Sequence, residues 1–485
     1  MKRREWLVIG GLFVVLFAVR LFLSAGEFTP DAYFHIRMVE HIAQTGVPMT
    51  YDPLSYGGRA LQFSPLFHYL LAVFSWVIPL DIVVHVLPQL FVSLLSLLIY
   101  IIVKKITENT SASSFSAVLA AVIPAFFAET LFSVSPLTLA LPLVFLTLYF
   151  FLYIEKNLYD LHFILVIIAL SLVHPSSIVL VIALIGYLLI TKLEKLELEK
   201  SELELILFST FLFLWIQFII YKKSFLTMGF ARLVQQNIPA ALAAEVFSLS
   251  SGAFLQIGIL PLIGGILCMY KYLLRMKNKA LYMYIALSIG VALLVFFKLL
   301  PPAHGFMYLG ISLSILSGPA YVFIIRYLNK TRVSRYTNLF VTFLFILVIP
   351  MMILPSIMLV RSTPVLSHDM DDALRWIAGH TSDDSVVLAP IELGYAVEAL
   401  AQRRTVADTN FLLIENADVV LADITRIYKT PLPTEAVKLF TTYAVDYIVI
   451  IPGNEPSYLN EPCLREVYKN NAARIYHSAC RLSVT

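Results

Sequence analysis

Apolar runs of membrane-spanning length recur along this 485-residue chain and restrict it to one structural class. A helix needs about 20 apolar residues to cross roughly 30 Å of hydrocarbon. With 59% hydrophobic and 14% charged residues, and a mean hydropathy of +0.83, the chain is more apolar than a water-soluble protein. We expect a polytopic α-helical membrane protein with about eleven spans, at residues 6–24, 82–103, 112–127, 136–154, 160–173, 175–191, 204–221, 252–270, 280–298, 305–326 and 338–358.

The basic loops predict the orientation of these spans. Cytoplasmic loops are enriched in Lys and Arg, and the N-terminal Lys-Arg-Arg, the 192–200 run and the 271–279 and 326–335 loops all fall on one side if every run crosses. This places the N-terminus in the cytoplasm. The run at 66–80 is an expected interfacial helix, because counting it as a span would invert every later loop. The net charge of +3 is explained by these loops and implies no nucleic acid as partner. The expected partner is the lipid bilayer, because of the apolar spans.

The first run has no clear cleavage site, so we expect a retained span rather than a signal peptide. That fits the plasma membrane of a prokaryote, with an internal membrane as the alternative. Composition then changes at Arg361, from apolar spans to the charge density of a soluble domain. We expect a transmembrane domain over residues 1–360, with a first outer loop at 25–81, followed by an extracytoplasmic domain over 361–485.

The C-terminal domain alternates helical and strand patterns, which predicts an α/β fold. Residues 369–381 and 395–404 have helical periodicity, whereas 385–390, 405–408 and 444–453 are strand-like. Cys463 and Cys480 flank two further strand-like segments. A disulfide between them is expected in an oxidising compartment, and two thiols elsewhere.

The first outer loop carries an acid and an imidazole on one helix face. Thr29, Pro30 and Asp31 match an N-cap and first turn, and Gly46 marks the end of the helix. Asp31 and His35 are four residues apart, so both can point at one ligand. The alternative is that Asp31 only complements the helix dipole.

Further polar residues occur where spans end on the same side. Arg59 follows two glycines and can meet a phosphate bidentately. Glu129, His174, Glu245 and His304 lie at the mouths of later loops. Ionisable groups near membrane depth tend to be functional, although at a loop mouth they can simply be solvated.

Several segments, taken in order, resemble the catalytic subunit of oligosaccharyltransferase, within the GT-C class of polyprenol-dependent membrane glycosyltransferases. They are TPDAYFHIR after the first span, TYDPLSYGGRALQFSPLFHYLLA completing its loop, and ALRWIAGHTSDDSVVLAP and ELGYAVEALAQRRTVAD in the tail. The resemblance spans most of the chain. It implies that Asp31, by motif position, binds a divalent cation, Mg²⁺ or Mn²⁺, and contacts the acceptor.

This chain departs from that family at three places. The second outer loop reads AETLFSVSP, with Glu129 where an arginine is expected and no paired acids after it. Residues 390–395 replace the tryptophan-tryptophan-aspartate motif that recognises a sequon, so transfer to an asparagine sequon is not expected. The lipid-phosphate arginine of a late span is replaced around His304.

We therefore expect a membrane glycosyltransferase that moves a sugar from a polyprenyl-phosphate donor to an unidentified acceptor on the outer face. The candidate residues divide by role: catalytic, Asp31 and Glu129; substrate-binding, His35, Arg37, Arg59, Glu245 and His304; metal-binding, Asp31. One alternative is a catalytically inactive relative that acts as a binding or assembly subunit. The other is a transporter, which is disfavoured because no inverted repeat is apparent and because Arg20 lies near a span end, where it can snorkel outward.

Overall fold

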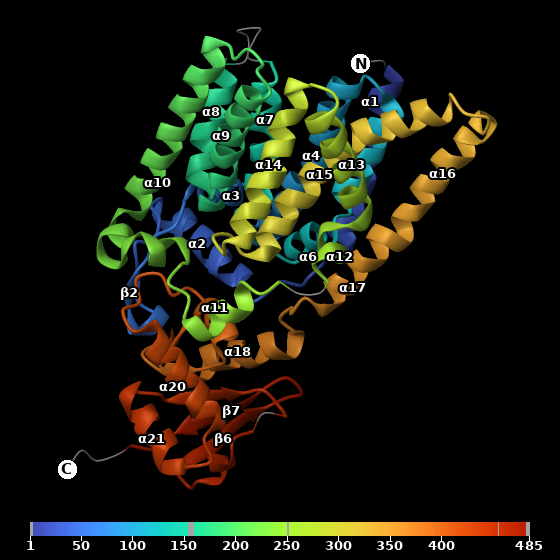
Figure 1. Cartoon of the computed structure of the whole chain (residues 1–485). Coiled ribbons are helices and arrows are strands. Elements are labelled where there is room, and N and C mark those ends of the chain that lie inside the picture. The colour runs from blue at the N-terminus through green and yellow to red at the C-terminus, as the bar shows by residue number, and fades with distance from the viewer. Residues whose placement is uncertain (1–2, 154–159, 250–251, 454, 482–485) are drawn as a thin grey trace.

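The computed structural model describes residues 3–153, 160–249, 252–453 and 455–481. An upright bundle of helices forms one end of the molecule and a sheet-containing domain forms the other, as Figure 1 shows. The expected class, a polytopic helical membrane protein with a C-terminal α/β domain, is confirmed.

In the described residues, seven helices or helix pairs are long and apolar enough to cross a membrane. They are α1 (Arg3–Leu23), α4 (Leu80–Thr107), α9 (Ile178–Leu193), α10 (Lys200–Val234), α14 (Lys279–Phe296), α15 (Pro302–Leu328) and the continuous pair α16 (Thr337–Val348) and α17 (Leu354–Ser362). Shorter apolar helices are α3 (Leu66–Ser75), α7 (Leu137–Phe151), α8 (Asp160–Val173) and α13 (Ile259–Leu274). Each expected span coincides with one of these helices or with the bent pair described next; residue 154, the expected end of the fourth span, lies outside the described residues.

One span is bent. Helices α5 (Thr110–Ala121) and α6 (Pro124–Leu131) meet at 51° and together make up an eighth candidate span. The sequence explains the break, because a residue before proline avoids the helical conformation and Ile123, before Pro124, is extended with φ −62° and ψ 125°. The bend gives α6 its own C-terminal end, with Glu129 in its last turn.

A layer of short elements lies between the bundle and the sheet domain (Figure 1). It contains α2 (Ala32–Thr45), the antiparallel strands β1 (Tyr51–Asp52) and β2 (Arg59–Ala60), and α11 (Ala240–Val246), while α12 (Ala253–Ile257) precedes α13. We call residues 25–64, which contain α2 and the two strands, the first loop. The first loop, which carries Asp31, His35, Arg37 and Arg59, therefore lies between the bundle and the C-terminal domain.

The C-terminal domain holds a mixed sheet of five strands in the order β4-β3-β5-β7-β6. These are β3 (Val386–Leu388), β4 (Arg404–Thr405), β5 (Tyr447–Ile450), β6 (Leu464–Lys469) and β7 (Arg474–Ser478). β3 is parallel to β4 and β5, whereas β7 pairs antiparallel with β5 and β6. Alternate residues of β5 enter different cores, because Ile448 and Ile450 pack on one side and Val449 on the other.

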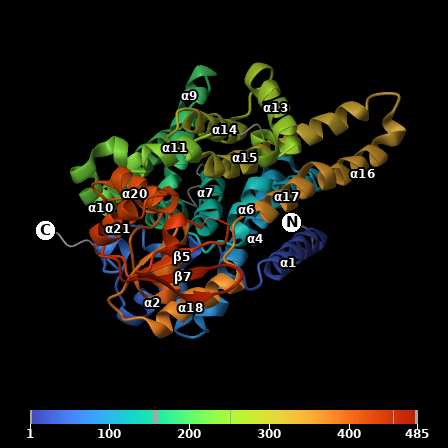
Figure 2. The same cartoon turned by 90° about the horizontal axis from the view of Figure 1, so that it is seen from below.

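Helices cover both faces of this sheet. α18 (His368–His380) contributes to the core that holds Val449, and α20 (Ala417–Lys429) and α21 (Pro433–Thr442) to the opposite core. Figure 2, seen from below, shows α20 and α21 on one side of the sheet and α18 on the other. α18 was expected from its periodicity, whereas α20 and α21 were not.

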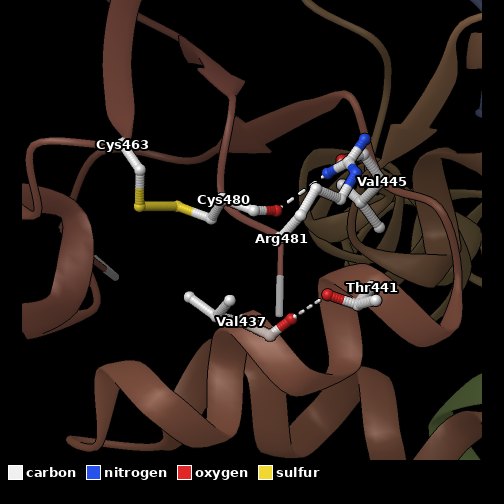
Figure 3. The surroundings of a disulfide bond; sticks show 6 residues. All are labelled: Val437, Thr441, Val445, Cys463, Cys480 and Arg481. Carbon is white, nitrogen blue, oxygen red and sulfur yellow. Dashed lines mark hydrogen bonds between the residues drawn. A yellow bond between two sulfur atoms is a disulfide. The ribbon is translucent and has the colours of Figure 1, made fainter. Parts of the chain in front are cut away.

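A disulfide joins Cys463, just before β6, to Cys480, just after β7 (Figure 3). Beside it, the Arg481 guanidinium donates to the carbonyl of Val445 at 3.0 Å and pairs with Asp446 at 2.8 Å. The end of the chain is thus held against the sheet by a covalent bond and an ion pair.

Replacing Cys463 and Cys480 by Ser is expected to lower the unfolding midpoint of protein purified under oxidising conditions. Closing a loop of 17 residues removes unfolded-state entropy worth about 3 kcal/mol. Thermal unfolding with and without reductant measures the effect, with Cys268→Ser as the control that keeps the response to reductant. A double variant as stable as the oxidised wild type would contradict the prediction.

Candidate active site

Asp31 points away from its own helix. It occupies the N-cap position of α2 but makes no capping hydrogen bond. Instead, its Oδ1 accepts a hydrogen bond of 3.0 Å from the hydroxyl of Thr409, in the C-terminal domain. The side chain is therefore held for something other than capping, which counts against a purely dipolar role.

The surroundings of Asp31 are apolar and acidic. Although the carboxylate touches solvent, the neighbouring protein removes much of its hydration and raises its pKa. The hydrogen bond from Thr409 lowers this pKa, and the negative charges of Asp408 and Glu392 raise it. A carboxylate with a raised pKa accepts a proton more readily than a free one.

Glu129 lies beside Asp31, in the last turn of α6. The backbone N–H of Thr29 donates to the carbonyl of Phe132 at 3.0 Å, which joins the start of the first loop to the end of α6. The charge of Asp31 acts on Glu129 across this junction. Both carboxylates are reached by solvent, so the structure brings together the two residues expected to be catalytic.

Arg20 holds the end of α6 that carries Glu129. Its Nε donates to Gln89 at 2.8 Å and one Nη donates to the Thr130 hydroxyl at 2.9 Å. The guanidinium also lies 4.9 Å from the ring centroid of Phe127. Gln89 in turn donates to the carbonyls of Thr130 and Leu131. The expectation that Arg20 snorkels outward is wrong: it is fully buried, and these groups bind two of its three guanidinium nitrogens inside the bundle.

A second group in the site consists of histidines. His35 Nδ1 and His68 Nε2 are hydrogen-bonded at 2.9 Å, and burial together with His68 lowers the pKa of His35 well below its ordinary value. The rings of His174 and His304 meet edge to face with centroids 6.2 Å apart, and His35 interacts electrostatically with His174. The four imidazoles therefore form one group at the bundle end of the site.

Hydroxyl groups complete this histidine group. His174 Nδ1 is 2.7 Å from the Ser176 hydroxyl, which is 3.1 Å from the hydroxyl of Tyr308. The sequence patterns did not indicate His68, Ser176, Tyr308 or Thr409. Of these, only His68 could have been recognised from the sequence, because it is a polar residue inside an apolar run.

Arg37 and Arg59, expected to bind the donor phosphate, are instead bound to carboxylates. Arg37 contacts both oxygens of Asp52, at 2.6 and 2.7 Å, and Glu398 at 3.0 Å. Arg59 pairs with fully buried Asp408 at 3.1 Å. Because these acids already neutralise them, the two arginines join the first loop to the C-terminal domain.

Glu245 is not brought to the site. It lies exposed on α11, and no contact between its side chain and Asp31 or Glu129 is found in the described residues. Glu392, which replaces part of the sequon motif, lies in a short 3-10 turn after β3, and its charge reaches Asp31. Among the residues that replace the tryptophan motif, the acid whose charge acts on Asp31 is therefore Glu392, and Asp408 of the same domain acts on Asp31 as well.

The residues around Asp31 provide an incomplete ligand set for a divalent cation. Within the described ranges, no group of three or more His, Cys, Asp or Glu is arranged to hold a metal ion. Mg²⁺ requires six oxygen ligands, some of which can be water and substrate phosphate, and Asp31 and Glu129 offer two carboxylates. These residues do not build a metal site by themselves, so no chemical step is assigned to a metal.

Three solved structures share this fold. The Archaeoglobus fulgidus oligosaccharyltransferase tethered with an acceptor peptide containing the NVT sequon aligns with a TM-score of 0.70, at 13% identity, over 93% of this chain and 69% of that chain. The same enzyme in complex with Zn and sulfate gives 0.66 at 14% identity, over 90% and 67%. ArnT from Cupriavidus metallidurans bound to undecaprenyl phosphate gives 0.55 at 14% identity, over 98% of each chain.

A family model described as dolichyl-phosphate-mannose-protein mannosyltransferase matches residues 62–221. No curated protein matches the sequence. The chain thus has the fold of the GT-C class of membrane glycosyltransferases. Within that class it is similar to archaeal oligosaccharyltransferase and to ArnT, which confirms the resemblance found in the sequence.

Replacing Arg20 by Met is expected to leave the unfolding midpoint unchanged or raised, because it removes a buried charge that no acid neutralises within the described residues. Turnover is expected to fall roughly ten- to hundredfold, since the end of α6 loses a fixed contact and Glu129 shifts. Thermal unfolding and a transferase assay on the same sample separate the two effects. Normal turnover in this variant would show that Arg20 does not position Glu129.

Glu398 predicts a dependence of stability on pH. Burial and the charges of Asp408 and Asp52 raise its pKa well above the ordinary 4.5. Between the pKa of the unfolded state and that of the native state, Glu398 carries a proton only in the native state. Its contribution to stability is therefore fully present below about pH 4.5 and is lost as the pH rises through the native pKa. Glu398→Gln is expected to flatten the fall in unfolding midpoint as the pH rises above about 4.5. Parallel curves for variant and wild type would rule this out.

Proposed function

We propose that this protein transfers a sugar from a polyprenyl-phosphate donor to an acceptor on the extracytoplasmic face of the membrane. The observation that carries the proposal is Asp31. It is a carboxylate of raised pKa, reached by solvent, bonded by Thr409 and faced by Glu129, and no cation pairs with it among the described residues. A carboxylate in such a setting suits the removal of a proton from an acceptor.

In the proposed step, Asp31 takes the proton from the acceptor hydroxyl as that oxygen attacks C1 of the donor sugar. The bond between C1 and the phosphate oxygen breaks, and its electron pair leaves with the polyprenyl phosphate. One displacement of this kind inverts C1, and its transition state resembles an oxocarbenium ion. Glu129 and Glu392 favour the developing positive charge of the sugar ring.

The histidine group is the proposed site of the donor phosphate. His174 and His304 present N–H donors at the bundle end of the site, where a lipid-linked phosphate would enter from the membrane, and the buried Tyr308 supports His174 through Ser176. His304 therefore keeps its expected role at the donor phosphate, and His174 and Tyr308 are added to this site. His35, which is bonded to His68, orients the histidine group. Arg37, Arg59 and Glu245 have no part in this step.

The proposed orientation puts the C-terminal domain outside and the N-terminus inside, in a plasma membrane. Lys104, Lys277 and Lys279 lie at the ends of spans that point away from the C-terminal domain, and in Figure 1 the N-terminus is also at that end. Excess Lys and Arg on this side supports a cytoplasmic assignment.

The Asp31→Asn variant tests the catalytic proposal. General-base catalysis contributes roughly two to four orders of magnitude, so turnover of labelled polyprenyl-phosphate sugars by the purified variant is expected to fall by that factor. Glu27→Gln, an exposed acid in the same loop, is the matched control and is expected to retain full activity. Wild-type turnover by Asp31→Asn would sink the proposal.

One observation favours a second candidate, a relative that binds the donor without transferring it. The family's paired acids are absent from the sequence of the second loop, and the ligand set for a metal is incomplete in the described residues. Tight binding of the labelled donor by the wild type, without release or transfer of sugar, would select this candidate.

A further inference from the structure

A separate pocket of about 660 Å³ lies where three distant segments meet. Its walls are the β1–β2 hairpin, the part of α10 beyond Tyr221 and the loop leading into α20. The N–H of Leu413 donates to the sulfur of Met228 at 3.3 Å, and the Asn237 side chain donates to the carbonyls of Phe411 and Ile414 at 2.9 and 2.8 Å. The walls are therefore directly bonded.

The path of α10 gives the pocket its shape. The expected span ends at residue 221, where Tyr221 departs from helical geometry, yet the chain coils on to Val234. Gly229 has φ 80° and ψ 169°, a conformation that favours glycine, and it turns the last residues of α10. Lys223, before this turn, and Arg232, after it, consequently line the same pocket.

The charge of the pocket is positive. Lys223 and Arg232 are exposed, and neither forms an ion pair within the described parts of the chain. Arg59 forms the inner wall, but Asp408 neutralises it. Glu415 is the one acid among the residues that line the pocket, which leaves an excess of one positive charge.

The side chains that line the pocket indicate which kind of ligand it can bind. A guanidinium and an ammonium that converge on one space bind phosphate oxygens well. Leu226 and Phe230, in the same part of α10, are 66% and 68% exposed, so apolar surface adjoins the cations. Cations next to exposed apolar side chains, beyond the end of a span, are suited to a phosphate ester at the membrane surface.

We propose that this pocket binds a phosphate group, separately from the site that holds Asp31 and the histidines. The phosphate would bridge α10 and the loop at 413–416. The same loop begins at Asp408 and Thr409, so a bound phosphate would also steady the hydroxyl that contacts Asp31. Its source is either a lipid headgroup or a free phosphate. The binding itself does not depend on the proposed transferase activity.

Binding is tested on the full-length protein in detergent, with no sugar donor present. Two probes are titrated while the unfolding midpoint is followed: inorganic phosphate at constant ionic strength, and a short-chain phosphatidic acid with the matching diacylglycerol as blank. The double variant Lys223→Gln/Arg232→Gln is expected to bind about thirtyfold more weakly, since each cation near a membrane surface contributes about a factor of five.

The matched control is Lys222→Gln, which removes an exposed lysine next to Lys223 that does not line the pocket. Saturable stabilisation of the wild type and of Lys222→Gln, weakened in the double variant, supports the proposal. A response to phosphatidic acid alone identifies a lipid, and a response to inorganic phosphate identifies a soluble source. No response to either probe, or equal responses from the double variant and the wild type, would overturn it. Because no donor is used, these outcomes are independent of the Asp31→Asn result.

Discussion

The buried ion pair between Arg59 and Asp408 connects the two halves of this molecule. Ser55 donates its hydroxyl to the same carboxylate, and the Tyr56 hydroxyl donates to the Asp408 carbonyl at 2.6 Å. Asp408 also accepts a 2.7 Å bond from the Asn410 N–H, which shapes the turn that carries Thr409. Removing one partner of such a buried pair costs about 3–5 kcal/mol. The position of Thr409, and with it the orientation of Asp31, rests on this contact.

A second cluster of charged residues strengthens the junction between the first loop and the C-terminal domain, and it explains why Glu398 holds a proton. Arg37 meets Asp52 and Glu398, and Glu398 also feels the charge of Asp408. Together with Arg59 the junction contains three acids and two bases, so one negative charge has no partner inside it. The raised pKa of Glu398 follows, because protonating that residue removes the excess charge. The junction is thus neutral when Glu398 carries a proton.

Sequence patterns predicted those features that depend on nearby residues. The spans, the helix that starts after Asp31 and the alternation in the C-terminal domain all follow from local periodicity and from capping residues. The meeting of Asp31 with Glu129 was expected from their shared side of the membrane. The distant partners of Arg37 and Arg59 were not predictable, because Glu398 and Asp408 lie about 350 residues away and no local pattern links them. Asp52 is only 15 residues from Arg37, but no helix or strand period relates the two positions. Both arginines were therefore assigned to phosphate, the ligand that their chemistry suggests.

Buried polar residues inside apolar runs were the other source of error. Arg20 was expected at a membrane surface because its run ends nearby, yet Gln89 and Thr130 bind it within the bundle. His68 was overlooked because the run around it reads as an interfacial helix. In both cases the residue type was visible in the sequence, whereas its partner came from another helix.

The bond between Thr409 and Asp31 spans 378 positions of the chain, and this sets the order in which the protein can mature. Asp31 is synthesised almost at the start, long before the segment that orients it. The C-terminal domain has to fold against the first loop before the centre is assembled. A ribosome product that stops short of residue 409 therefore inserts into the membrane with its acid unoriented, so only completed chains would have an oriented Asp31.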